Sequence, residues 1–322
     1  MKAFVTGSNG FIGYNLCQTL QTQGYEVMGL DDLSSGLAEN SIATFRYERG
    51  KVQDKERVVA LLRDFQPDVV FHLAAIPRVS YSVEQPFASA EANLLGTISL
   101  LEGLVKAELV GKTRLVNTSS SSIYGGVDQF PTPENYPGQP QSPYALEKYQ
   151  AEEWCRLFAN LYGLDVVSLR YFNVFGPHAL FGGAYSTVLS AWLYHLYVDP
   201  TYEPFLEGDG TQTRDFCYVD NVVQANMLAV TRERRFVGEA FNIAQGRSYS
   251  LLECRDMLEE LSGRKLNLVL RPPRVGDVKH TLADISAAQR ELGYEPSVDF
   301  ISQLMTMAEW YRLSYPKRSI LP

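Results

Sequence analysis

Two side chains that can move a proton, Tyr144 and Lys148, lie four residues apart near the middle of the chain. If residues 142–148 begin a helix, this spacing puts both side chains on one helical face. A free tyrosine has a pKa of about 10 and is a poor base at neutral pH, but a nearby ammonium group stabilises the phenolate. The pair therefore predicts a tyrosine that exchanges a proton with a substrate, although the same spacing is common on ordinary amphipathic helices.

A glycine-rich turn stands near the amino terminus, where Gly7, Gly10 and Gly13 follow the apolar run of residues 2–6. In such a turn the first glycine permits a tight bend, the second lets the backbone approach a pyrophosphate, and the third lets helix and strand pack closely. Asp31 ends the next apolar run, where a carboxylate can accept hydrogen bonds from ribose hydroxyls and repels a 2′-phosphate. The turn therefore predicts NAD, rather than NADP, as cofactor.

Four consecutive serines, residues 119–122, follow another apolar run and precede Tyr124. Serines after a strand are usually loop residues, and their hydroxyls can also hydrogen-bond a reacting oxygen. The glycine turn, the serines and the tyrosine–lysine pair, in this order, are hard to dismiss as a chance combination.

The segments that must position these residues alternate between apolar runs and helical patterns. Strands are expected at residues 2–6, 25–30, 68–73, 114–117 and 165–170, and helices at 11–23, 58–65, 88–106 and 144–162. Near-continuous apolar strands joined by helices predict an α/β fold with a Rossmann-type, doubly wound parallel sheet covered on both faces.

After about Gly176 the pattern loosens, and short strands at 240–243 and 267–270 mix with short helices. We expect residues 1–176, with returning segments near 212–235, to form the NAD-binding domain. Residues 177–322 are expected to form mainly a smaller, discontinuous C-terminal substrate lobe that caps the carboxyl edge of the sheet.

Composition excludes several classes of function. The 322-residue chain has a net charge of −8, which argues against nucleic acid or an anionic membrane as partner. Its four cysteines are far apart and no histidine has metal-ligand spacing, so we expect no metal. No stretch approaches the roughly 20 apolar residues of a membrane span, and the chain opens directly on a strand-like run, so we expect a cytoplasmic protein.

The chain resembles the extended short-chain dehydrogenase/reductase family, specifically its nucleotide-sugar 4-epimerase branch, which acts on UDP-hexoses and UDP-N-acetylhexosamines. The resemblance covers nearly the whole chain and includes residues 6–13, 31, 72–75, 93, 119–125, 144, 148, 170–177, 208–210, 213–216 and 274–277. It implies a set of NAD-binding residues: Gly7, Gly10, Phe11, Ile12, Gly13, Asp31, Leu73, Ala74, Ala75, Asn93, Tyr144, Lys148 and Tyr171.

By the same resemblance, Tyr144 is the catalytic base and acid, Lys148 holds the nicotinamide ribose and lowers the pKa of the tyrosine, and Ser120 hydrogen-bonds the reacting sugar hydroxyl. In the implied reaction, C4 of the sugar is oxidised, and the 4-keto sugar then rotates about its diphosphate tether. It is reduced on the opposite face, and NAD stays bound throughout. The implied substrate-binding residues are Arg78, Ser122, Asn173, Val188, Arg214, Arg274, Asp277 and Thr281, of which Asn173, Arg214 and Arg274 would bind the diphosphate of UDP.

The identity of the sugar depends on Thr281, four positions after Asp277. In the epimerases that this chain resembles, a bulky tyrosine there excludes N-acetylated sugars. Because Thr281 is small, UDP-GlcNAc/UDP-GalNAc is the preferred pair, with UDP-glucose/UDP-galactose as a further pair. UDP-glucuronate 4-epimerisation stays open as an alternative, since Arg78 could pair with a carboxylate.

Other activities of the same fold fit less well. Related dehydratases carry Asp-Glu where this chain has Ser121 and Ser122, and related decarboxylases place a glutamate in that segment. A nucleotide-sensing scaffold without activity predicts the loss of Tyr144 or Lys148, and both are present.

The chain departs from the family pattern near the expected adenine and sugar sites. Lys51-Val52 replaces the usual aspartate and aliphatic residue that hold adenine, and Arg78 replaces a small residue. The resemblance also implies a homodimer through the helices at 93–106 and 147–162. The apolar residues expected at that interface are Leu100, Leu101, Leu104, Trp154, Phe158 and Leu161.

Overall fold

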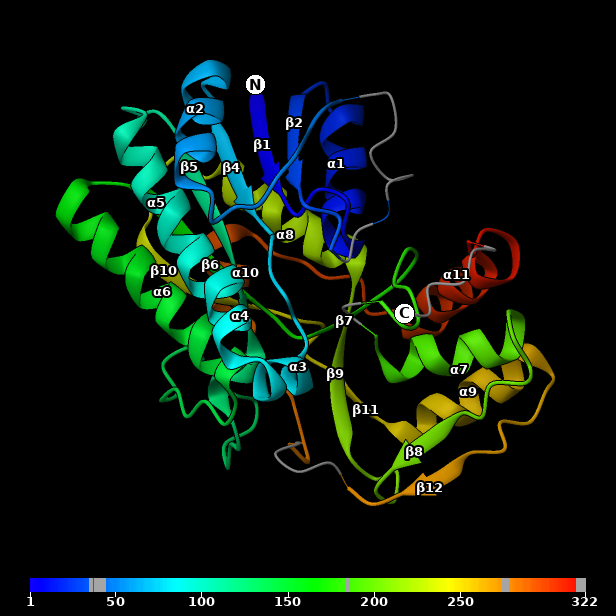
Figure 1. Ribbon diagram of the computed structural model, residues 1–322. Coiled ribbons are helices and arrows are strands. Elements are labelled where there is room, and N and C mark those ends of the chain that lie inside the picture. The colour runs from blue at the N-terminus through cyan, green and yellow to red at the C-terminus, as the bar shows by residue number, and fades with distance from the viewer. Residues whose placement is uncertain (35–36, 38–44, 184–185, 274–277, 317–322) are drawn as a thin grey trace.

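The computed structural model describes residues 1–34, 37, 45–183, 186–273 and 278–316. A large lobe of helices around a sheet carries the amino terminus, and a smaller lobe lies beside the carboxyl ends of its strands (Figure 1).

Seven of the described strands form one parallel sheet, which confirms the predicted doubly wound α/β fold. In spatial order they are β3 (Arg46–Arg49), β2 (Glu26–Asp31), β1 (Lys2–Thr6), β4 (Val69–His72), β5 (Arg114–Ser120), β6 (Asp165–Tyr171) and β10 (Val237–Ile243). The order 3-2-1-4-5-6 reverses direction between β1 and β4, and ligands bind at such switch points in open α/β sheets.

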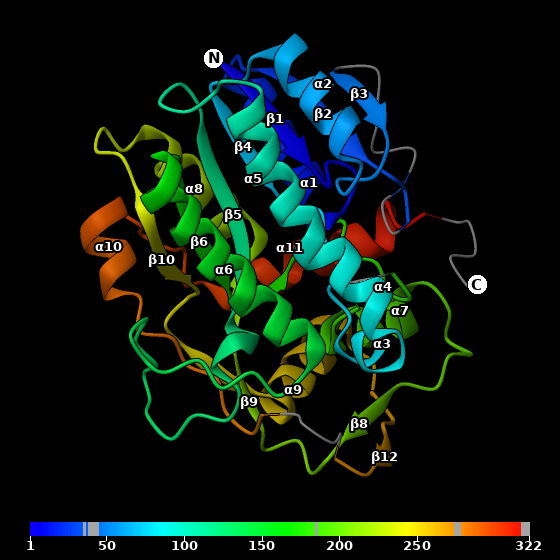
Figure 2. The same cartoon turned by 60° about the vertical axis from the view of Figure 1, so that its left-hand side comes forward.

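Helices cover both faces of this sheet (Figure 2). Helices α1 (Phe11–Thr22) and α8 (Val219–Thr231) pack together on one face, and α2 (Lys55–Phe65), α5 (Gly96–Lys106) and α6 (Pro143–Tyr162) pack on the other. Because side chains alternate along a strand, Val5 of β1 joins one core and Phe4 the other. The sheet is therefore buried on both sides, as its apolar strands predict.

Local signals explain why α6 begins just before the tyrosine–lysine pair. The side chain of Ser142 accepts a hydrogen bond from the backbone N–H of Ala145, and Pro143 occupies the first helical position. Gly163 ends the helix with a φ of 77°. These caps place Tyr144 in the first turn, at the carboxyl edge of the sheet.

The single helix expected at residues 88–106 is divided in the structure. It consists of α4 (Pro86–Ala90), a π-helical turn η2 (Glu91–Leu95) and α5, and the short helix α3 (Val79–Glu84) precedes it. The wider π turn lies where the chain faces the cavity.

The smaller lobe contains two short sheets. One joins β7 (Asn173–Phe175), β9 (Thr213–Tyr218) and β11 (Ser248–Ser250), and the other joins β8 (Phe205–Glu207) and β12 (Val269–Arg271). Around them lie α7 (Val188–Tyr197), α9 (Leu251–Ser262) and α11 (Phe300–Leu313), whereas α10 (Ser286–Leu292) packs against β10 and α8 of the large lobe.

One expected strand belongs to a different sheet than the sequence suggested. Residues 240–243 were expected in the second lobe, but they are part of β10, which extends the main sheet by pairing with β6. Phe241 and Ile243 bury their side chains in the same core as Val167 and Leu169 of β6. Strand pairing depends on which exposed edge the returning chain meets, and the local sequence does not encode that.

No helix in the described ranges is long and apolar enough to cross a membrane.

Candidate active site

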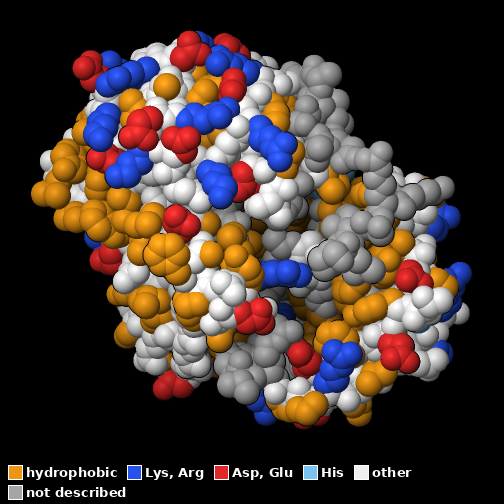
Figure 3. Space-filling model, viewed as in Figure 1, with side chains coloured by type: hydrophobic (Ala, Val, Ile, Leu, Met, Phe, Trp, Pro, Cys, Tyr) orange, Lys and Arg blue, Asp and Glu red, His pale blue; other side chains and the backbone are white. Residues whose placement is uncertain are grey.

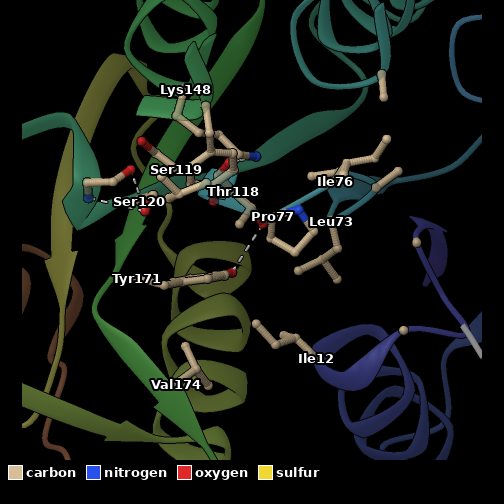
Figure 4. A pocket seen from close by; sticks show the side chains of 18 of the residues that line it. Ile12, Leu73, Ile76, Pro77, Thr118, Ser119, Ser120, Lys148, Tyr171 and Val174 are labelled. Atoms are coloured by element: carbon tan, nitrogen blue, oxygen red, sulfur yellow. Dashed lines mark hydrogen bonds between the residues drawn. The ribbon is translucent and has the colours of Figure 1, made fainter. Parts of the chain in front are cut away.

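A cavity of about 690 Å³ lies between the carboxyl edge of the main sheet and the smaller lobe. The surface is visibly hollowed between the two lobes (Figure 3). Inside, Lys148, Tyr171 and Ile12, from α6, β6 and α1, surround one space (Figure 4). Most of the predicted site residues line it: Gly7, Gly10, Phe11, Ile12, Gly13, Asp31, Leu73, Ala74, Ala75, Ser120, Ser122, Tyr144, Lys148, Tyr171, Asn173, Arg214 and Thr281.

At one end of the cavity, the glycine turn between β1 and α1 approaches the segment after β4 too closely for any side chain. Gly7 has a φ of 72°, and a Cβ built on it would lie 2.7 Å from the backbone nitrogen of Ala74. A Cβ on Gly13 would lie 2.0 Å from the carbonyl oxygen of Gly7. Glycine is therefore required at both positions. The turn leads into the N-terminus of α1, which lines the cavity at Phe11 and Ile12, and a helix N-terminus is suited to bind a phosphate.

The carboxylate of Asp31 lies buried at the end of β2 on the same wall. One of its oxygens accepts a hydrogen bond from the backbone N–H of Leu33 at 2.8 Å, and the other accepts from that of Asn9 at 3.0 Å. The backbone N–H of Gly10 also acts on this carboxylate, which still has acceptor capacity for a ribose hydroxyl. Burial raises the pKa of Asp31, and these N–H groups partly counter that rise. The cradle and the carboxylate fit the phosphates and the adenosine ribose of NAD.

The tyrosine–lysine pair occupies the opposite wall. Lys148 donates a hydrogen bond from Nζ to the carbonyl oxygen of Thr118 at 2.9 Å. Burial lowers the pKa of Lys148 to about 8, and the charge of Glu147 counters part of that fall. Burial also raises the pKa of Tyr144 to about 12, against the effect of a hydrogen bond with Ser120. Desolvation of the phenolate therefore outweighs the other protein groups around Tyr144, and the lowering of its pKa expected from Lys148 together with the charged nicotinamide ring stays a prediction.

The hydroxyl of Ser120 is oriented by its neighbour. Its oxygen accepts hydrogen bonds from the backbone N–H of Ser122 at 3.2 Å and from the hydroxyl of Ser122 at 3.0 Å. Both lone pairs of Ser120 are thus engaged, so its own hydrogen is the part that can be donated. Ser120 is built to donate toward Tyr144 or a reacting oxygen.

Asn173, Arg214 and Thr281 are among the residues with which the smaller lobe lines the cavity. Thr281 Oγ1 accepts from the backbone N–H of Asp215 at 2.9 Å and from Asn173 Nδ2 at 3.4 Å. Arg214 donates from Nη1 to the carbonyl oxygen of Thr213 at 2.9 Å. These contacts bring Asn173, Arg214 and Thr281 together, although they are far apart in the sequence.

A buried carboxylate, that of Asp215, holds this wall in place. It accepts hydrogen bonds from the backbone N–H groups of Gln245, Gly246 and Ala283 at 3.0 to 3.1 Å. Burial raises the pKa of Asp215 to about 7, and the N–H groups oppose that shift. Asp215, the residue after Arg214, therefore ties the segments at 245–246 and at Ala283 to β9.

Three predicted residues do not line the cavity. Arg78 is exposed at the start of α3, although its neighbours Pro77 and Val79 face the cavity. Val188 begins α7 and packs against the core of the smaller lobe. Asn93 is buried behind the wall, because the backbone of Ile76 uses both ends of its amide. Arg274 and Asp277 lie outside the described residues.

Several wall residues were not predicted. Lys51, Val52 and Gln53 line the cavity near Asp31, so the departure from the adenine-binding pattern does lie on the wall. His178 also lines it, with a φ of 71° and its ring between those of Tyr14 and Trp310. A positive φ outside glycine has no sequence signature, so only the preceding Gly-Pro hinted at an unusual turn there.

Comparisons with known proteins identify the family of this chain. The model of the NAD dependent epimerase/dehydratase family matches residues 3–244. The chain is 35% identical to a UDP-glucose 4-epimerase of Thermotoga maritima solved with UDP-glucose, with a TM-score of 0.91 over 97% of this chain and 99% of that one. It is 30% identical to a UDP-N-acetylglucosamine 4-epimerase of Methanobrevibacter ruminantium solved with UDP-N-acetylmuramic acid, with a TM-score of 0.88 over 96% and 97% of the two chains.

A third similar structure, a UDP-glucuronic acid 4-epimerase of Bacillus cereus in complex with UDP-glucuronic acid and NAD, is 30% identical, with a TM-score of 0.86 over 97% of this chain and 99% of that one. Proteins named for three different sugars are thus about equally similar to this chain, whereas their fold and cofactor agree. The chain belongs to the NAD-dependent epimerase/dehydratase family of extended short-chain dehydrogenases/reductases, within its UDP-sugar 4-epimerase branch, and its cofactor is NAD.

Proposed function

We propose that this NAD-dependent UDP-sugar 4-epimerase interconverts UDP-N-acetylglucosamine and UDP-N-acetylgalactosamine. The observation that carries the choice of sugar is the small side chain of Thr281 on the cavity wall, held by Asp215 and Asn173. Its oxygen already accepts two hydrogen bonds, so its hydrogen remains to be donated to an acetamido oxygen. Arg78, which would have paired with the carboxylate of an acidic sugar, is exposed instead of lining the cavity.

The residues around the cavity divide the chemistry among them. Bound NAD supplies the hydride acceptor and, when oxidised, a positive charge in the cavity. Ser120 donates a hydrogen bond to the reacting oxygen, and Tyr144 removes and returns the hydroxyl proton. Burial and the charge of Glu147 raise the pKa of Tyr144 to about 12 against the hydrogen bond with Ser120, so loss of its proton depends on positive charge in the site, which Lys148 and the oxidised nicotinamide ring would contribute. Arg214 and Asn173 bind the diphosphate, whose oxygens suit a guanidinium group.

The sugar can be identified with purified protein and a panel of UDP-sugars, with products resolved by NMR. We expect turnover of UDP-GlcNAc and UDP-GalNAc. Turnover confined to UDP-glucuronate, or to the UDP-glucose pair, would overturn the assignment.

A variant series at Thr281 tests the reason for the choice. Thr281→Tyr overfills the wall and should lower kcat/KM for the N-acetylated pair about tenfold to a hundredfold, the equivalent of roughly 1–3 kcal/mol. Thr281→Val is the matched control for volume, because it removes the hydroxyl without enlarging the side chain. It should lower kcat/KM for the N-acetylated pair by the loss of the hydrogen bond to the acetamido oxygen, whereas the loss of the contacts with Asp215 and Asn173 should affect all UDP-sugars alike. If Thr281→Tyr lowered kcat/KM beyond the level of Thr281→Val equally for the N-acetylated pair and for UDP-glucose and UDP-galactose, the proposal would be contradicted.

We also propose that two copies associate through the outer face of α6. Trp154, Leu157 and Leu161 are exposed on that helix at spacings of three and four residues, and Leu161 is 65% exposed. Apolar side chains gather at that edge of the molecule in Figure 3. Of the residues expected at this interface, Leu100, Leu101 and Leu104 are excluded, because they are fully buried in the core of the large lobe, and Phe158 is also buried.

Light scattering at micromolar concentration measures this association. The wild-type protein should have the mass of a dimer, and Leu161→Glu should have that of a monomer. Leu313→Glu, on the equally exposed end of α11, is the control and should remain dimeric. A monomeric wild-type protein would contradict the proposal.

A further inference from the structure

A buried carboxylate that the proposed chemistry does not use lies directly behind the catalytic wall. Glu147, between Tyr144 and Lys148 on α6, is 4% exposed and faces α4 and η2 instead of the cavity. We propose that Glu147 is a positioning residue that couples the helix carrying Tyr144 and Lys148 to the cofactor-side segment 73–77 through Asn93. This inference rests on the proposed function, whose chemistry requires that α6 and the segment 73–77 hold fixed positions relative to each other.

The coupling consists of a short chain of hydrogen bonds. Glu147 Oε2 accepts from Asn93 Nδ2 at 2.6 Å and from the hydroxyl of Ser89 at 2.8 Å. Asn93 Oδ1 accepts from the backbone N–H of Ile76 at 2.7 Å, and its Nδ2 lies 3.1 Å from the carbonyl oxygen of the same residue. Leu73 to Pro77 all line the cavity. One carboxylate therefore connects α6 to the segment that forms the opposite wall.

The helix that supplies Asn93 is modified at the same place. Asn93 is the central residue of the π turn η2, with α-helix on either side. Single π turns within α-helices occur frequently at functional sites. Here the turn presents the amide of Asn93 between Ile76 and Glu147, and this explains why the predicted helix at 88–106 is interrupted there.

The arrangement leaves one oxygen of Glu147 without a partner. Among the described residues, no group hydrogen-bonds Oε1, although the atom is buried. A buried carboxylate oxygen without a hydrogen bond is unfavourable, and a neutral side chain at this position would avoid that cost. We therefore explain the carboxylate at position 147 by two effects: its charge acts on Tyr144 and Lys148, and its side chain is long enough to hydrogen-bond Asn93.

The charge acts on both catalytic side chains, since Glu147 raises the pKa of Tyr144 and also that of Lys148. Lys148 also feels Glu152 and Cys155 from α6, and its own charge lowers the pKa of His72 on β4. The groups that α4 and η2 present to Glu147, Ser89 and Asn93, are neutral. Removing the charge of Glu147 lowers the pKa of both catalytic groups, so both limbs of the pH profile move to lower pH.

Two substitutions test the length of the Glu147 side chain and its charge independently. Glu147→Gln removes the charge and keeps an oxygen that can accept from Asn93. Glu147→Asp keeps the charge but is shorter by one methylene, so it cannot reach Asn93. Glu153→Gln is the matched control, because Glu153 is an exposed neighbour on α6 paired with Arg156.

The measurements are NAD retained per chain after gel filtration and the pH profile of kcat at saturating UDP-sugar. Glu147→Gln should retain NAD and move both limbs down by about one pH unit, the lower end of what a nearby charge does. Glu147→Asp should lose NAD at least tenfold faster on dilution, and Glu153→Gln should match the wild type.

A Glu147→Gln profile that coincides with that of the wild type, or wild-type NAD retention in Glu147→Asp, would overturn the proposal. If Glu147→Gln does not fold, NAD retention in Glu147→Asp decides alone. NAD retention needs no sugar, so an inactive wild-type protein would refute the proposed function without affecting this test.

Discussion

The close approach of the glycine turn to the segment after β4 can be tested with two glycines of nearly equal backbone conformation. Gly7 has a φ of 72° and Gly24 a φ of 78°. A Cβ on Gly24 would meet nothing within 4 Å, whereas a Cβ on Gly7 would lie 2.7 to 2.9 Å from backbone atoms of Leu73 and Ala74. The substitution to alanine therefore imposes the same backbone strain at both sites, but only one produces a clash.

The expected magnitudes follow from that difference. Left-handed backbone destabilises alanine by about 1–2 kcal/mol, so Gly24→Ala should lower the free energy of unfolding by that amount. Gly7→Ala adds overpacking against backbone that cannot rotate away, about 1–3 kcal/mol more. Relief of the clash must also move the 73–75 segment away from the glycine turn, and both line the cofactor end of the cavity.

Urea denaturation followed by circular dichroism gives the free energies of unfolding, and the NAD content of each purified variant reports on the cavity. Gly24→Ala should retain NAD as the wild type does, whereas Gly7→Ala should lose it. Equal destabilisation of the two variants, together with wild-type NAD content in Gly7→Ala, would refute the reasoning from the close approach.

Three further predictions concern the cofactor, the catalytic tyrosine and a buried ion pair. The protein should purify with NAD already bound, and NADP in the supernatant of denatured protein, or no dinucleotide and no activation by added NAD, would contradict the role given to Asp31. Tyr144→Phe should reduce kcat about 10²–10⁴-fold with little change in UDP-sugar binding, and Ser120→Ala should reduce it less; near-normal turnover would exclude Tyr144 as the base. Glu152→Gln leaves the buried guanidinium of Arg170 without its charged partner, so it should lower the free energy of unfolding in urea by about 3–5 kcal/mol. The control Glu153→Gln, at an exposed pair, should lower it by about 1 kcal/mol or less. Equal losses in the two variants would contradict the importance of the buried pair.

The features predicted correctly from the sequence depend on local rules. Glycine spacing after a strand located the cradle around Gly7 and Gly13, and the Ser142-Pro143 cap with the four-residue spacing placed Tyr144 and Lys148 on one helical face. In each case, neighbouring residues in the chain determine the geometry. The parallel sheet followed in the same way from near-continuous apolar strands alternating with helices.

The features that were missed depend on packing between distant segments. Nothing in residues 240–243 indicates that the edge of β6 is free to pair with them, and nothing near Arg78 indicates that its side chain turns toward solvent. Among the protein groups, burial has the largest effect on the pKa of Tyr144. Burial is a property of the folded chain as a whole, so neighbouring residues do not reveal it.

A motif also marks positions without stating what each residue touches. Asn93, Ser122 and Thr281 were all assigned to ligands, yet each engages protein groups: the backbone of Ile76, the hydroxyl of Ser120, and the backbone N–H of Asp215. Backbone groups at the ends of strands and in the turns beside a cavity lack ladder partners and must be satisfied by nearby side chains. Residues that hold a site together are therefore as specific in type and spacing as those that touch its ligands. Substitution at such a position should change cofactor retention or pH dependence, whereas substitution of a contact residue should change the choice of sugar.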